Sequence, residues 1–124
     1  MPMDYGWKTI IGKVPSKSNS YRVASRDGHG TIVKSDRIRD YERSFYMQVG
    51  SLRNLEIDSL YEFYVRVYYP TMSSDLDNAL KVLEDCLQHT KTLKNDNRCV
   101  KIVAEKFIDK VNPRVEFRIV TIDD

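Results

Sequence analysis

The chain has 124 residues, of which 41% are hydrophobic and 31% charged, and its formal net charge is +2. This composition is typical of one globular domain spanning residues 1–124, and it excludes an intrinsically disordered chain. No apolar run approaches the roughly 20 residues of a transmembrane helix, and the N-terminus shows no signal peptide, so we expect no membrane association.

The cysteines and the distribution of charge add weaker indications. Cys86 and Cys99 occur in no metal-binding pattern, so we expect reduced thiols in a cytoplasmic protein. Residues 1–50 contain nine Lys or Arg against five Asp or Glu, whereas residues 51–124 contain eleven against thirteen. A basic first half and an acidic second half suit a polyanion held near a cation, although chance also produces such an asymmetry.

The first part of the chain predicts one strand, one loop and one helix. Residues 7–14 are rich in β-branched side chains and end at a proline, which predicts a strand. Residues 15–30 carry the turn-forming residues of a polar loop, and residues 31–34 follow as a short extended segment. Ser35 is the predicted N-cap of a helix that ends before a glycine. The core-facing stripe of this helix consists of Ile38, Tyr41, Phe45 and Val49.

Basic and aromatic residues interleave in the predicted polar loop; they are Lys17, Tyr21, Arg22 and Arg26. This mixture suits contacts to DNA phosphates and bases. A solvated surface loop is the competing interpretation. The same alternatives apply to three arginines of the following helix that lie mostly off its apolar stripe, where solvation is favoured; they are Arg37, Arg39 and Arg43.

The second half predicts a strand, a helix and two further strands. Residues 60–69 alternate apolar and polar positions and end at a proline, as a long strand does. Residues 75–89 place leucines on one helical face. Residues 98–108 and 114–122 predict two strands that we expect to pair as a hairpin. The element order therefore predicts an α/β (α+β) fold, with a mixed β-sheet and two main helices packed on one face.

Four polar residues around the second helix point to metal-dependent chemistry. Asp75 and Asp77 stand at the junction of strand and helix, where free N–H groups and the helix dipole favour negative charge. Asp96 lies in the loop before the next strand, which we expect at the same edge of the sheet. The three carboxylates could bind Mg²⁺, which prefers oxygen ligands and would polarise a phosphate. Lys81, on the same helix face as Asp77, could neutralise the developing charge.

Each of these residues also has a purely structural interpretation. Asp75 can serve as an N-cap, Asp77 and Lys81 as an exposed ion pair, and Asp96 as a turn residue. Catalysis by a thiol or hydroxyl nucleophile is disfavoured, because neither histidine has a recognisable partner. The glycine-rich loop that cradles phosphates in nucleotide-binding proteins is absent from the sequence.

The order of these residues resembles the RusA family of Holliday junction resolvases. In that family the motif DxDNxxK is followed by a helix and then by an acidic turn before a strand. The corresponding segments here run from Asp75 to Lys81 and from Asn95 to Arg98. The likeness extends over about residues 7–122. Two positions depart from it, because Asn95 stands where an acidic residue is frequent and Arg98 where a glutamine is common.

The resemblance implies a Mg²⁺-dependent endodeoxyribonuclease that resolves Holliday junctions by paired symmetric nicks in DNA recombination and repair. It implies that Asp75, Asp77 and Asp96 bind the metal and that Lys81 is catalytic. It also implies branched DNA as the partner and a homodimer, since a two-fold enzyme can nick two strands symmetrically. Two other functions stay open: a catalytically weak DNA-binding module of the same fold, and a small interaction domain in which the aspartates are caps.

Overall fold

The structure is a computed structural model that describes residues 2–16, 21–26, 29–34 and 36–122; for 21–26 and 29–34 only the backbone is considered. The helices and strands are β1 (Asp4–Ile11), β2 (Tyr21–Arg26), β3 (His29–Lys34), α1 (Asp36–Gln48), β4 (Tyr61–Tyr69), α2 (Leu76–His89), β5 (Cys99–Ile108) and β6 (Arg114–Thr121). Two 3-10 turns complete the set, Gly50–Leu52 before β4 and Asp96–Arg98 before β5. No helix of the described residues is long and apolar enough to cross a membrane.

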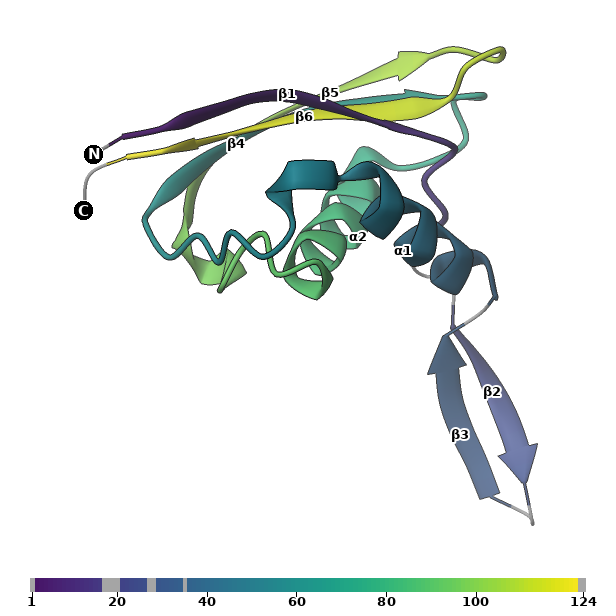
Figure 1. Cartoon of the computed structure of the whole chain (residues 1–124). Helices are drawn as coiled ribbons and strands as arrows, with labels where there is room; N and C mark the ends of the chain where they lie inside the picture. The colour runs from purple at the N-terminus through teal and green to yellow at the C-terminus, as the bar shows by residue number, and fades with distance from the viewer. Residues whose placement is uncertain (1, 17–20, 27–28, 35, 123–124) are drawn as a thin grey trace.

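Four strands form a mixed sheet in the order β1–β6–β4–β5. β4 pairs in parallel with β5, whereas β6 pairs antiparallel with both β1 and β4. Both helices cover one face of this sheet, and the other face is open (Figure 1). The fold is therefore α+β with a mixed sheet and two helices on one face, which confirms the fold class predicted from the order of elements.

Buried and partly buried residues alternate along β4, and the buried ones form the face of the sheet that contacts the helices. Every second residue of this strand, from Tyr61 to Tyr69, is buried against the helices. The α1 stripe is buried as predicted, and its Phe45 stacks on Phe117 of β6 with 5.9 Å between the ring centroids. Burying a large apolar side chain contributes about 1.5–3 kcal/mol, so these contacts fix the helices to the sheet.

The face of α2 that packs on the sheet is rotated relative to the predicted leucine face. Leu83 and Leu87 are buried, but Leu76 and Leu80 are only partly buried. Positions spaced three and four apart make the buried stripe of a helix. Here they are Ala79, Val82, Leu83, Cys86 and Leu87.

Two predictions about strands are wrong. Residues 15–30 are not one loop, because β2 and β3 pair antiparallel as a hairpin that projects away from the sheet beside the start of α1 (Figure 1). The turn-forming residues obscured two short runs of strand-forming residues. β5 and β6 do not pair as a hairpin, because β4 lies between them. The first strand is also shifted, to Asp4–Ile11, and the predicted cap Ser35 lies outside the described residues.

Candidate active site

Asp75 and Asp77 lie where β4 gives way to α2. β4 ends at Tyr69, because the proline that follows cannot extend the hydrogen-bond ladder. Asp75 occupies the N-cap position of α2, but its side chain makes no capping hydrogen bond. Asp77 and Lys81 are both exposed, and the ion pairs among the described residues do not include this pair. The structural roles of these side chains as cap and ion pair are therefore not realised, and both carboxylates are accessible.

Hydrogen bonds from two strands hold the loop in front of Asp75. The hydroxyl of Tyr69 donates to the backbone carbonyl of Asp75 at 3.1 Å. From β5, the Lys106 ammonium donates to the carbonyl of Met72 at 2.8 Å and also to that of Ser74. Burial, together with the neighbouring carboxylates of Asp75 and Asp77, raises the pKa of Tyr69 to about 12, so this hydroxyl stays a donor at neutral pH. The loop is thus fixed to the sheet.

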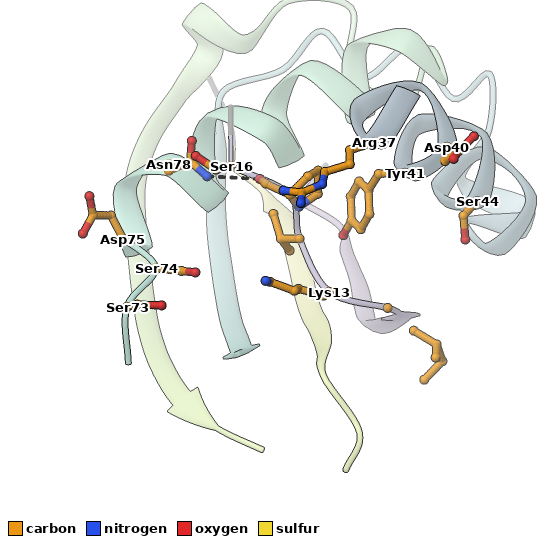
Figure 2. Close-up of a pocket in the computed structure, with 14 residues that line it drawn as sticks. Lys13, Ser16, Arg37, Asp40, Tyr41, Ser44, Ser73, Ser74, Asp75 and Asn78 are labelled. Atoms are coloured by element: carbon orange, nitrogen blue, oxygen red, sulfur yellow. Dashed lines mark hydrogen bonds between the residues drawn. The ribbon is translucent and has the colours of Figure 1, made fainter. Parts of the chain in front are cut away.

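An open cleft of about 810 Å³ lies next to this loop. Its walls come from the segment after β1, the first turns of α1 and the loop before α2 (Figure 2). The polar residues that line it are Lys13, Ser16, Arg37, Asp40, Tyr41, Ser44, Ser73, Ser74, Asp75 and Asn78. Asn78 ties two walls together, because its side-chain amide donates to the carbonyl of Pro15 at 3.1 Å. Two helix N-termini and the cations Lys13 and Arg37 make this cleft suited to an anion.

Tyr41 contributes an unusual group to the wall of this cleft. The residue is only 6% exposed, and its buried hydroxyl has no hydrogen-bond partner among the described residues. Burial raises the pKa of Tyr41 well above its ordinary value, so the hydroxyl is a protonated donor. Buried polar groups are rarely left unpaired. Sequence reasoning treated Tyr41 only as core, although a tyrosine in an apolar stripe always carries a polar end.

Asp96 lies at the other end of the sheet, which contradicts the expectation that it shares an edge with Asp75 and Asp77. It begins the turn directly before β5, and the parallel register places the start of β5 beside Tyr61, at the start of β4. The nine residues of β4 make eight steps from Tyr61 to the end of the strand, a span of about 26 Å. The expectation was wrong because β4 and β5 are parallel: the chain that leaves the end of β4 must return to the end of the sheet where β4 starts before β5 can begin. Within the described ranges, no three His, Cys, Asp or Glu residues group closely enough to hold a metal.

The surroundings of Asp96 show that it is not the cap of its own turn. The side chain of Asn95 takes that role by accepting a hydrogen bond from the N–H of Asn97 at 3.3 Å. Burial raises the pKa of Tyr61, and the nearby Asp96 carboxylate adds to that effect. Asn95 is one of the departures from the family pattern, and its capping role gives it a local structural reason.

The basic and aromatic residues predicted to bind DNA fall into two groups. Lys17 lies outside the described residues, whereas three belong to β2 of the projecting hairpin; they are Tyr21, Arg22 and Arg26. Among the arginines of α1, Arg37 lines the cleft, while Arg39 and Arg43 border a different hollow with Tyr46 and His89. Lys13 also lines the cleft and was not singled out from the sequence, because its partners in the cleft lie far along the chain.

The family model for endodeoxyribonuclease RusA matches residues 13–120. This chain belongs to the RusA family. The match includes most of the residues that line the cleft, both helices and the two acidic segments. The observed mixed sheet with two helices is consistent with a RusA-like fold. RusA proteins are endodeoxyribonucleases that act on branched DNA junctions. A comparison with curated proteins found no match.

Proposed function

We propose that this RusA-family protein is a Mg²⁺-dependent endonuclease that resolves four-way DNA junctions by paired nicks. The observation that carries the proposal is the position of two exposed carboxylates: Asp75 lines a cleft that also holds cations, and Asp77 follows it in the first turn of α2. A protein that only bound DNA would gain nothing from carboxylates beside the phosphates, because they repel a polyanion. If the two carboxylates held a divalent cation, its positive charge would instead attract the phosphates.

The donor chemistry of this end of the fold fits magnesium. Mg²⁺ takes oxygen ligands and usually keeps several waters, with one or two protein carboxylates and oxygens of the substrate phosphate. Asp75 and Asp77 would hold it, because the Asp75 carboxylate makes no capping bond and Asp77 is exposed in the first turn of α2. When bound, the ion would polarise the scissile phosphate and lower the pKa of an attacking water.

The remaining residues of this end would position the DNA. Lys13 and Arg37 would neutralise backbone phosphates in the cleft, and the unpaired hydroxyl of Tyr41 would donate to a phosphate oxygen. Lys81 lies one helical turn after Asp77 and would stabilise negative charge on the leaving oxygen. The β2–β3 hairpin would extend the contact along a DNA arm through its arginines.

Two nicks in a two-fold junction require two sites, so the proposed enzyme is a homodimer. Asp96 cannot join Asp75 and Asp77 of its own chain, because it lies at the other end of β4 and β5. In a dimer, the second chain would supply this third carboxylate. Each site would then draw two ligands from one chain and one from the other.

The experiment compares cleavage of a labelled four-way junction and a linear duplex of the same sequence, with Mg²⁺ or with EDTA. Wild-type protein should make paired nicks near the branch point only when Mg²⁺ is present. Asp77→Asn should bind the junction but not cut it, whereas Asp85→Asn, an exposed position later on α2, should cut like wild type. Tight, selective binding by wild type without any cutting would favour the DNA-binding module instead. Absence of selective binding would contradict both functions.

A further inference from the structure

A second, more open hollow of about 430 Å³ lies between α1 and the end of α2. Its walls are His89, the last residue of α2, and a stripe of α1 whose members are spaced three and four apart, Arg39, Glu42, Arg43 and Tyr46. The 14 residues of α2 rise about 20 Å, so this hollow lies far from the end of α2 that borders the cleft. The hollow is therefore separate from the proposed active site.

Tyr46 is exposed in this hollow but held from two sides. The guanidinium of Arg53 lies 4.9 Å from the centroid of the Tyr46 ring and donates a 3.0 Å hydrogen bond to the Tyr46 carbonyl. The ring of His89 approaches the same ring edge-on, with 6.5 Å between the centroids. An aromatic side chain that is ordered before binding loses little conformational entropy, and such tyrosines often dominate the energetics of protein interfaces. Tyr46 thus has the properties of a preorganised interface anchor.

Two guanidinium groups beside this ring are available to a ligand. Arg39 is exposed and belongs to no ion pair in the described part of the chain. Arg43 pairs with Asp40 at 3.5 Å, but the two side chains are 77% and 72% exposed. Ion pairs as exposed as this contribute little to stability, so Arg43 can exchange its partner. Guanidinium groups bind carboxylates in a bidentate manner, and the hollow can therefore hold acidic side chains.

The charges around the hollow favour a protein ligand over a DNA backbone. Glu42 lies in the wall among the arginines, and α2 ends here, so the negative end of its helix dipole also faces the site. A DNA strand carries a negative charge at every nucleotide and would meet both of these groups. A protein segment can instead place its carboxylates at the arginines and an apolar side chain on the ring of Tyr46.

We propose that this hollow docks an acidic segment of a partner protein. Carboxylates of the segment bind Arg39 and Arg43, and an apolar side chain of the segment packs on Tyr46. Met47, which is 70% exposed and follows Tyr46 in α1, extends the apolar contact. This interaction goes beyond DNA cleavage, because a partner docked at the far end of α2 leaves the cleft free. A protein already bound to branched DNA can thus bring this enzyme to its substrate.

A titration of the isotope-labelled full chain with a synthetic peptide, followed by NMR without DNA or metal, tests the site. The probe is the peptide Glu-Asp-Phe-Asp-Glu, and its neutral match is Gln-Asn-Phe-Asn-Gln. The acidic peptide should shift the amide signals of α1 from Arg39 to Met47 and that of His89. The neutral peptide should bind about tenfold more weakly or worse, because it lacks the charge-assisted hydrogen bonds. A four-way junction added to the complex should leave the peptide bound.

Four variants separate the anchor from the charges. Tyr46→Ala should weaken peptide binding by about tenfold, whereas Tyr46→Phe keeps the ring and should bind like wild type. Arg43→Glu should lose most of the binding. Lys110→Glu is its matched control, because it makes the same charge change at an exposed residue in the turn after β5. Circular dichroism spectra show that each variant is folded.

The outcomes for the docking site and for cleavage are independent. Absence of peptide binding, equal binding of the neutral peptide, or equal binding by Arg43→Glu and Lys110→Glu would overturn the docking site. Displacement of the peptide by junction DNA would show that the hollow is a DNA contact and would also overturn it. None of these results involves cutting, so the cleavage proposal would stand. An inactive wild type that binds the acidic peptide as expected would remove the cleavage proposal alone.

Discussion

The hydroxyl of Tyr69, the last residue of β4, donates a 3.1 Å hydrogen bond to the backbone carbonyl of Asp75. This bond joins the end of a central strand directly to the residue in front of α2. Lys106 reinforces it from the neighbouring strand through the carbonyls of Met72 and Ser74. The proposed metal-binding carboxylate is thus placed by the sheet, as a site that depends on precise geometry requires.

Removing this hydroxyl should disturb Asp75 more than it disturbs DNA binding. Tyr69→Phe keeps the buried ring but leaves the carbonyl of Asp75 without its donor, so the free energy of unfolding should fall by about 0.5–1.5 kcal/mol. The single-turnover cutting rate should fall while junction affinity stays at the wild-type level. Tyr64→Phe is the control, because the Tyr64 hydroxyl donates to Glu62 on the open face, away from the cleft. Equal cutting rates in the two variants would contradict the anchoring role.

In contrast to Tyr69→Phe, the substitution Tyr41→Phe should weaken junction binding without lowering the free energy of unfolding. The Tyr41 hydroxyl is buried without a partner among the described residues, so its removal should leave the free energy of unfolding unchanged or slightly higher. If this hydroxyl donates to a DNA phosphate, junction affinity should fall by up to about tenfold, since one hydrogen bond contributes about 0.5–1.5 kcal/mol. Urea unfolding and a binding titration with EDTA present separate the two effects. Unchanged affinity would exclude the phosphate contact.

The cleft cations should make a sequence-independent contribution to DNA binding. Lys13→Ala removes one phosphate contact and should reduce the slope of log K against log salt by about 1 for every junction sequence tested. Arg39→Ala, on α1 but beside a different hollow, should leave the slope nearly unchanged. A salt titration of junction binding for both variants makes the comparison. If both lose the same slope, the cleft has no special part in DNA binding.

The pairing of Asp4 with Arg118 predicts how stability depends on acid. Hydrogen bonds from the Arg118 side chain and then from the N–H of Gly6 lower the pKa of Asp4 to about 2. Since the unfolded value is about 3.9, this pair stabilises the fold fully above pH of about 4 and loses its effect as the pH falls toward 2. Asp4→Asn should therefore show a smaller drop in Tm between these pH values. Parallel Tm curves for the two proteins would contradict this.

Local patterns predicted the elements better than their pairing. The stripe of α1 and the alternation of β4 depend on neighbouring residues, and both are found as predicted. The partners of β6 depend on a competition among strands far apart in sequence. β4 takes the position beside both β5 and β6, so the local hairpin that the Asn-Pro turn favoured does not form.

The parts of the site that were predicted depend on neighbouring residues, whereas the parts that were missed depend on residues far apart in the sequence. Asp75 and Asp77 could be placed at a strand–helix junction because motif and elements are contiguous. Asp96 was assigned to the wrong end, because its position depends on the direction of the crossover between β4 and β5. Lys13 and Tyr41 were missed, because the cleft forms only when three distant segments meet.

The most direct test of the central proposal is junction cleavage by an equimolar mixture of Asp77→Asn and Asp96→Asn chains, equilibrated so that mixed dimers form. Each variant alone should be inactive, because every site then lacks one carboxylate. In a mixed dimer, one site combines the intact Asp77 of one chain with the intact Asp96 of the other, so Mg²⁺-dependent cutting should return as single, unpaired nicks. A mixture that stays inactive, or an Asp96→Asn protein that cuts like wild type, would contradict a site shared between two chains.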